Sequence, residues 1–194
     1  ARERYELLTS LVTPRPIGWF STWSEDGVAN LAPFSYFMAL SASPMLVGVS
    51  IADRRDGPKD TLVNLRARGA FCANLVEERH LEEMNASSAA VGREVDEFGL
   101  TGLGRATSDR VDAPYVEDCP AVLECEVRRE IDLGEAPNTL VIAEVVGIRL
   151  AGELSFEEGT MLVMPEDLRT VGRLGGSAYV LPGAVRRIPR PDRG

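Results

Sequence analysis

The sequence predicts a mainly β protein with a few helices, folded as a barrel rather than as a doubly wound sheet. Many short apolar or alternating segments are separated by tight turns, and only a few segments have helical spacing. A doubly wound sheet would need a helix after nearly every strand. No repeat or linker divides the chain, so we expect one domain over residues 1–194, with a barrel at about 15–180 and a tail at 181–194.

The first part of the chain predicts a short helix followed by two strands. Apolar residues at helical spacing predict the helix over residues 4–12, and two prolines end it. Residues 17–23 and 28–37 are expected to be strands joined by a tight Asp-Gly turn. Pro33 lies in the second strand. Because proline cannot donate to a ladder, we expect an edge strand or a bulge at this position.

The middle of the chain predicts a buried strand that leads into a helix. Residues 45–51 are almost continuously apolar, as is typical of a buried strand. Leu62 and Leu65 repeat at helical spacing, and Gly69 is suited to end that helix. The elements expected next are a strand over residues 70–76, a helix over 80–92 and a loop that contains 96–104.

The last part predicts a long β-hairpin. Residues 121–133 alternate between apolar and charged side chains, with Leu123, Cys125 and Val127 on one face. Residues 139–150 are mostly apolar and form the returning strand, after a turn over residues 135–138.

Charge and composition exclude several classes of partner. A formal net charge of −9 argues against a nucleic-acid-binding protein. Three cysteines without a CxxC pair and the single His80 make a disulfide framework or a zinc site improbable, and we expect no metal. The chain has neither an apolar run of about 18 residues nor a secretory leader pattern. We therefore expect a reduced, cytoplasmic protein with no membrane partner.

A basic loop in this acidic chain predicts an anion site. Arg54, Arg55 and Lys59 lie between the end of a buried strand and the expected start of a helix. Free N–H groups and the dipole at a helix start favour an anion such as phosphate. Lys59 would add a point charge, and either arginine could fork onto phosphate oxygens.

The residues around the loop leave an alternative open. Ser50 and Thr61 supply hydroxyl donors, whereas Asp60 is negative and counts against an anion unless it caps the helix. Either Asp60 or Thr61 is expected to be that cap. No Walker or Rossmann glycine motif is present. The alternative is an ordinary capped helix after a solvated, charged turn.

Several segments, taken in their order and spacing, resemble the flavin reductase-like proteins with the FMN-binding split barrel, in their flavoredoxin-like branch. The resemblance covers nearly the whole chain, from about Tyr5 to Tyr179. The segments that carry it are "TPRPIGWFSTWSEDGVANLAPFSYF", "SPMLVGVSI", "KDTLVN", "FCANLV", "EMNASS", "DEFGLTG", "TLVIAEVV" and "VGRLGGSAY".

The resemblance implies a homodimeric split β-barrel that holds FMN noncovalently near the dimer interface. "APFSYF" would lie along the isoalloxazine or ribityl part, and the basic loop would hold the phosphate. Asn85 and Ser87 match a helix start near the flavin, and Gly176 and Tyr179 would close the ring end of the pocket. The FMN-binding residues implied are Pro33, Phe34, Ser35, Tyr36, Ser50, Ile51, Arg54, Lys59, Asp60, Thr61, Asn85 and Ser87.

Several of these residues have a structural alternative. Phe34 and Tyr36 could instead be aromatic residues of the barrel wall. Asn85 could cap a helix, and Gly176 could simply form a turn. Two further aromatic residues, Trp19 and Trp23, are expected in the core or at a dimer interface.

The resemblance implies an NAD(P)H-dependent FMN reductase, which passes a hydride from nicotinamide to flavin and could supply a partner monooxygenase. Because the cofactor carries the chemistry, no catalytic side chain is expected. Many family members carry a Gly-Asp-His turn before the strand that matches "TLVIAEVV", but residues 134–138 here read Gly-Glu-Ala-Pro-Asn. The alternative is therefore an FMN-binding electron-transfer protein that does not react with nicotinamide. A split barrel for another planar ligand is a third, less favoured interpretation.

Overall fold

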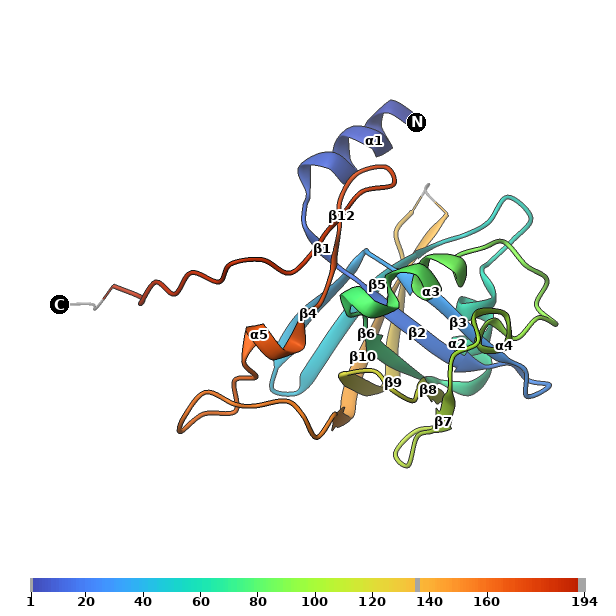
Figure 1. Ribbon diagram of the computed structural model, residues 1–194. Helices are drawn as coiled ribbons and strands as arrows, with labels where there is room; N and C mark the ends of the chain where they lie inside the picture. Colours follow the sequence, from blue (N-terminus) through green and yellow to red (C-terminus); the bar gives the residue numbers. More distant parts are fainter. Residues whose placement is uncertain (1, 135–136, 192–194) are drawn as a thin grey trace.

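The computed structural model describes residues 2–134 and 137–191, and these residues form a mainly β fold, as predicted. Seven antiparallel strands make the main sheet, in the spatial order β3-β2-β6-β9-β10-β5-β4 (Figure 1). The sheet curls until β3 contacts β5, which gives a barrel. The bounds of these strands are β2 Gly18–Trp23, β3 Ala29–Phe34, β4 Phe37–Ala42, β5 Met45–Ala52, β6 Ala70–Leu75, β9 Ala121–Asp132 and β10 Asn138–Leu150.

A small second sheet joins the two ends of the chain. It pairs β1 (Arg15–Pro16) with β11 (Gly172–Arg173), which in turn pairs with β12 (Tyr179–Val180). Figure 1 shows this sheet beside the N-terminal helix, on one side of the barrel. The remaining elements are α1 Arg2–Leu11, α2 Asp60–Arg68, a 3₁₀ turn at Glu78–His80, α3 Leu81–Ala86, α4 Glu97–Thr101, β7 Arg105–Thr107, β8 Pro114–Val116 and α5 Pro165–Leu168.

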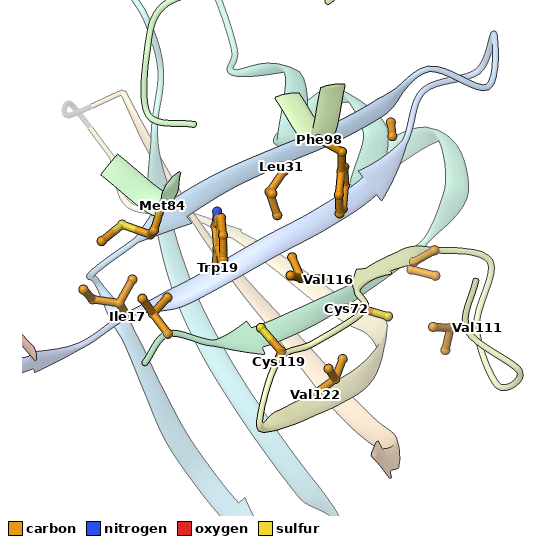
Figure 2. Packing of buried hydrophobic residues seen from close by; sticks show 14 of the residues in the cluster. Ile17, Trp19, Leu31, Cys72, Met84, Phe98, Val111, Val116, Cys119 and Val122 are labelled. Atoms are coloured by element: carbon orange, nitrogen blue, oxygen red, sulfur yellow. The ribbon is translucent and has the colours of Figure 1, made fainter. Parts of the chain in front are cut away.

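The main sheet buries one apolar cluster on each of its faces. Phe20 and Phe71 stack on one face with their ring centroids 4.5 Å apart, and α2 adds Leu62 and Leu65 to that cluster. Consecutive residues of a strand point to opposite faces, so Trp19 belongs to the other cluster. There α3, α4 and the segment around β8 cover the sheet (Figure 2). Both faces of the sheet are therefore packed, and Trp19 lies in the core, as expected.

Local chemistry explains the turn and the helix end that the sequence predicted. Gly27 has a φ of 79°, and its N–H donates to the carbonyl of Ser24, which closes the turn between β2 and β3. Gly69 has a φ of 69° and ends α2 with a bond from its N–H to the carbonyl of Leu65. Pro33 lies in β3, an edge strand of the sheet, as predicted.

Other expectations about the elements were wrong. The strand expected over 28–37 ends at Phe34, and the unpredicted β4 follows it. The helix expected over 80–92 ends at Ala86, whereas the expected loop contains α4. Asp96 is the N-cap of α4 because its carboxylate accepts from the N–H of Phe98 at 2.9 Å. Residues 135–136 of the predicted turn lie outside the described residues.

Candidate functional site

A hollow of about 280 Å³ opens where β3 and β5 end, next to the small sheet. We call it the first hollow. All four residues of the predicted segment 33–36 line it, together with Lys59 of the basic loop. The residues that line it are Tyr5, Thr9, Ile17, Pro33, Phe34, Ser35, Tyr36, Ser50, Ala52, Lys59, Met84, Asn85, Ser88, Arg173 and Tyr179.

A second hollow of about 230 Å³ adjoins the first. The two hollows share Pro33, Lys59 and Ser88, so together they form one elongated cleft. The second hollow is lined by Asn30, Ala32, Pro33, Arg54, Lys59, Asp60, Thr61, Ser87, Ser88, Ala89, Ala90 and Glu97. The cleft thus joins an aromatic compartment to a polar one, with Lys59 between them.

Lys59 is a partly buried cation that has no acidic partner among the residues that the structure describes. Its Nζ lies 5.1 Å from the ring centroid of Phe34, and no carboxylate of the described residues forms an ion pair with it. Burial lowers the pKa of Lys59, and the charge of Arg54 lowers it further. An anion bound in the cleft would favour the charged form of Lys59 and so raise its pKa again.

The start of α2 differs from the expected capped helix. Lys59, not Asp60 or Thr61, is the N-cap residue, and its side chain makes no capping hydrogen bond to the free N–H groups there. Asp60 instead forms an ion pair of 2.8 Å with Arg54. The buried Thr61 donates its hydroxyl to Oδ1 of Asn30 at 2.8 Å. The N–H groups that begin α2 therefore lack a side-chain cap and lie beside the cation.

Strand alternation separates Ser50 from Ile51 at the end of β5. Ser50 lines the first hollow, but the side chain of Ile51 is fully buried in the core and lines neither hollow. The backbone of Ser50 is also tied to the predicted segment, because its N–H donates to the carbonyl of Tyr36 at 2.9 Å. Arg55 is exposed and also lies outside both hollows.

The end of α3, rather than a helix start, faces the cleft. Asn85 is in the last turn of that helix and lines the first hollow. Ser87 is buried, and its hydroxyl is already hydrogen-bonded within the protein. Its Oγ accepts from Nε1 of Trp19 at 2.9 Å and donates to the carbonyl of Met84. Ser88, which the sequence reasoning missed, is exposed and lines both hollows. Its position in "MNASS" was the available signal.

The aromatic residues of the segment 33–36 lie between the barrel wall and the first hollow. Phe34 is buried and packs on Phe20 with a centroid distance of 5.4 Å, yet it also lines the first hollow. Tyr36 is partly exposed there. Burial raises the pKa of Tyr36, and the nearby Tyr5 raises it further, so its hydroxyl stays protonated at neutral pH and can donate.

The buried Arg15 links the segments that surround the first hollow, and the sequence did not predict this role. Its buried guanidinium donates to the carbonyls of Thr9 at 2.6 Å and Val12 at 2.9 Å, at the end of α1. It also donates to the carbonyl of Leu174 at 3.0 Å and to Oγ of Ser35 at 3.3 Å. One side chain therefore connects α1, the turn after β11 and the predicted cleft segment.

Arg173 and Tyr179 form the rim of the first hollow. The guanidinium of Arg173 lies 4.4 Å from the ring centroid of Tyr179 and donates to the carbonyl of Gly176. The Tyr179 hydroxyl donates to Oδ1 of Asn85 at 3.3 Å. Gly176 itself has a φ of 60° and makes the turn between β11 and β12, but it lines neither hollow.

The residues of the cleft fit a ligand with a flat aromatic part and a terminal anion. Proline and aromatic side chains wall the first hollow, and Lys59 with the uncapped start of α2 marks the place for the anion. The described residues contain no group of three or more His, Cys, Asp or Glu side chains placed to hold a metal. Within the same residues, no helix is long and apolar enough to cross a membrane.

A curled, mainly β barrel with an elongated cleft beside the ends of β3 and β5 is the architecture of the split-barrel class of proteins. The chain belongs to the flavin reductase-like family, since residues 10–172 match the flavin reductase like domain. It is 36% identical over 195 residues to protein BH2278 of Halalkalibacterium halodurans. The match covers 98% of this chain and 92% of the relative.

Solved structures agree with this family. Nitrilotriacetate monooxygenase component B from Bacillus cereus superposes with a TM-score of 0.90 at 29% identity, covering 96% of this chain and 93% of that one. Flavoredoxin of Desulfovibrio vulgaris (Miyazaki F) superposes with a TM-score of 0.80, covering 91% of each chain. At 20% identity the second likeness concerns the fold alone.

Proposed function

We propose that this protein binds FMN in the cleft and is an NAD(P)H-dependent flavin reductase. The observation that carries the proposal is the position of Lys59, a partly buried cation where an aromatic hollow meets a polar one, with no ion-pair partner in the described part of the chain. Among common cofactors, FMN combines a planar ring system with a single terminal phosphate, and membership of the flavin reductase-like family supports this choice.

The cleft residues would bind and orient the cofactor. Lys59 and the N–H groups at the start of α2 would hold the phosphate. Phe34 and Pro33 would exclude water from the ring, and the protonated hydroxyl of Tyr36 would offer it a hydrogen bond. When bound, FMN would supply the capacity to accept and pass on a hydride. No side chain of this chain needs to act as a general acid or base, so the protein contributes orientation and electrostatics.

We further propose that the protein is a homodimer in which a second copy covers α1. Thr9 is the only buried residue of this helix, whereas Leu8 and Leu11 are 53% and 71% exposed. A helix of ten residues is marginal in water without an apolar partner surface. Tyr5 and Thr9 of α1 line the first hollow, so the covering copy would also border the cleft.

An electron-transfer protein is the second candidate function. The turn between β9 and β10 reads Gly-Glu-Ala-Pro-Asn over residues 134–138 and carries no histidine. The N–H of Asp53, which begins the basic loop, donates to the carbonyl of Pro137 in this turn at 2.7 Å. Pro137 therefore lies beside the basic loop that borders the cleft, so a change of sequence in this turn would matter for nicotinamide. In this alternative, FMN passes electrons between protein partners without reacting with nicotinamide.

Anaerobic reduction followed by absorbance separates the two functions. The purified protein is loaded with FMN and mixed with NADH, then with NADPH. Bleaching of the flavin band near ~450 nm within seconds supports the reductase. A band that persists with both donors but bleaches with dithionite supports the electron carrier. A protein that does not retain or bind FMN at all contradicts both.

A reductase of this kind would deliver reduced flavin to a separate enzyme. Because a similar solved structure is component B of a monooxygenase, we propose a partner monooxygenase as the consumer. We place both in the reducing cytoplasm, since all three cysteines of this chain are buried and unpaired, and burial raises the pKa of each thiol.

A further inference from the structure

Two arginines are paired on adjacent strands of the small sheet, one buried behind the cleft and the other at its rim. Arg15 in β1 and Arg173 in β11 are direct cross-strand partners. Side chains at such positions lie on the same face of a sheet, and like charges placed there destabilise the pair. No carboxylate of the described residues forms an ion pair with either arginine. A local arrangement that opposes folding is most often retained where a ligand needs it.

The two arginines differ in how much of their hydrogen-bonding capacity is in use. Arg15 is buried, and three backbone carbonyls and the Ser35 hydroxyl take its donors. Arg173 is partly exposed, and among the described residues its side chain donates only to the carbonyl of Gly176. A guanidinium has five N–H donors, so most of those on Arg173 remain open to a ligand.

Arg173 is also held in one orientation. Its guanidinium carbon lies over the ring of Tyr179 in a cation–π contact, 4.4 Å from the ring centroid. Tyr179 is in turn bonded to Asn85 through its hydroxyl. Because the fork is oriented before any ligand arrives, less side-chain entropy is lost on binding.

Of the three cationic side chains that line the cleft, Arg54 is paired with Asp60, whereas Lys59 and Arg173 have no carboxylate partner among the described residues. Lys59 lines both hollows and adjoins the start of α2, whereas Arg173 lines the first hollow but not the second. The proposed FMN phosphate occupies the Lys59 side, which leaves Arg173 without an anion at the other rim. The second ligand of a flavin reductase is a dinucleotide, and its diphosphate offers paired oxygens that match a guanidinium fork.

We propose that Arg173, oriented by Tyr179, binds the diphosphate of the nicotinamide dinucleotide and determines specificity for that class of hydride donor. The proposal rests on the function proposed above. It makes Arg173 a substrate-binding residue that acts on docking and not on the hydride step itself.

The test compares Arg173→Gln with a matched control in the FMN-loaded protein. Arg110→Gln removes the same charge from an exposed arginine that lines a different hollow. Binding is measured by calorimetry with ADP-ribose, which carries the diphosphate but no nicotinamide. We expect Arg173→Gln to weaken ADP-ribose binding and raise KM for NAD(P)H about 10- to 100-fold, as loss of a charge-assisted fork implies. Arg110→Gln should change neither, and FMN affinity should stay constant in both variants.

A donor without a diphosphate gives the decisive contrast. N-benzyl-1,4-dihydronicotinamide should reduce the flavin of Arg173→Gln as fast as that of the wild type. An equal loss with both donors would overturn the proposal, and so would weaker FMN binding in the variant.

The outcomes also separate this inference from the proposed function. If NAD(P)H reduces the wild-type protein and KM is unchanged in Arg173→Gln, the inference is wrong and the proposed reductase function stands. ADP-ribose binding that depends on Arg173 without any reduction by NAD(P)H supports the docking site and contradicts the reductase. Wild-type protein that neither binds ADP-ribose nor reacts overturns both.

Discussion

The guanidinium of Arg15 donates to the carbonyl oxygen of Leu174 at 3.0 Å, a contact between residues 159 positions apart in the chain. The same guanidinium bonds to the carbonyl of Thr9 in the last turn of α1 and to that of Val12 directly after the helix. Those carbonyls carry the negative end of the helix dipole and have no partner within the helix, so a buried cation is well placed there. The N-terminal helix and the C-terminal turn thus meet at the cleft through one side chain.

Arg15→Met should lower the free energy of unfolding by about 2–3 kcal/mol, because backbone carbonyls lose a charged donor and remain partly buried. Replacing a buried ion pair by apolar residues can be neutral, but here the acceptors belong to the backbone and cannot be removed with the arginine. Urea unfolding measures the change. Arg128→Met is the control, since this exposed arginine forms ion pairs with Glu126 and Glu144 at the surface, where solvent screens such pairs and they add little to stability. Equal losses in the two variants would contradict the role given to Arg15.

Lys59→Ala should weaken FMN binding about 10- to 150-fold, the equivalent of one charge-assisted contact of about 1.5–3 kcal/mol. The same change should leave the stability of the unliganded protein equal or slightly higher. The folded state lowers the pKa of Lys59, so its charged form is disfavoured there at neutral pH. Fluorescence titration with FMN and thermal unfolding without it measure the two effects. Arg55→Ala, in the same loop but outside both hollows, is the control. An unchanged FMN affinity in Lys59→Ala would remove this residue from the site.

Glu97 should make stability depend on pH just above its ordinary titration range. This buried carboxylate accepts from the side-chain amide of Asn30 and the N–H of Leu31, both at 3.0 Å. Burial nevertheless raises its pKa above the usual 4.5, with a further contribution from Asp60. The folded state therefore binds the proton more tightly than the unfolded state does. The stability that this proton supplies is complete below about pH 4.5 and is lost as the pH rises through the raised pKa.

Glu97→Gln should flatten this part of the pH profile, because glutamine does not ionise. Urea unfolding at intervals between pH 4.5 and 7 measures the profile for both proteins. Glu94→Gln, an exposed carboxylate nearby in sequence, is the control and should leave the profile as in the wild type. A slope that persists in Glu97→Gln would assign the dependence to another group.

Local signals made much of the fold predictable, because Pro33 restricts the backbone and Gly27 and Gly69 permit the positive φ that a turn or a helix end requires. α4 could have been found as well, since Asp96 is a good N-cap residue and Gly102 ends the helix in the left-handed region. β4 is harder. Its residues, "FMALSA", do not alternate, and it lies at the edge of the sheet.

The candidate site was predictable where its residues are consecutive. The segment 33–36 and Lys59 all line the cleft. Side chains alternate along β5, so that of Ser50 points into the cleft and that of Ile51 points into the core. The pairing of Arg15 with Arg173 joins distant segments, and no periodicity or spacing in the sequence reports such a contact.

The exposed apolar face of α1 yields the last prediction. Leu8→Asp should convert the proposed dimer to a monomer and weaken FMN binding, because a buried carboxylate at the interface costs several kcal/mol and α1 borders the first hollow. Light scattering coupled to gel filtration measures the mass, and titration measures FMN affinity. Arg4→Asp places the same carboxylate at an exposed polar position of the same helix and should leave the dimer intact. A wild-type protein of 21.1 kDa in solution would contradict the dimer, and a Leu8→Asp dimer would move the interface away from α1.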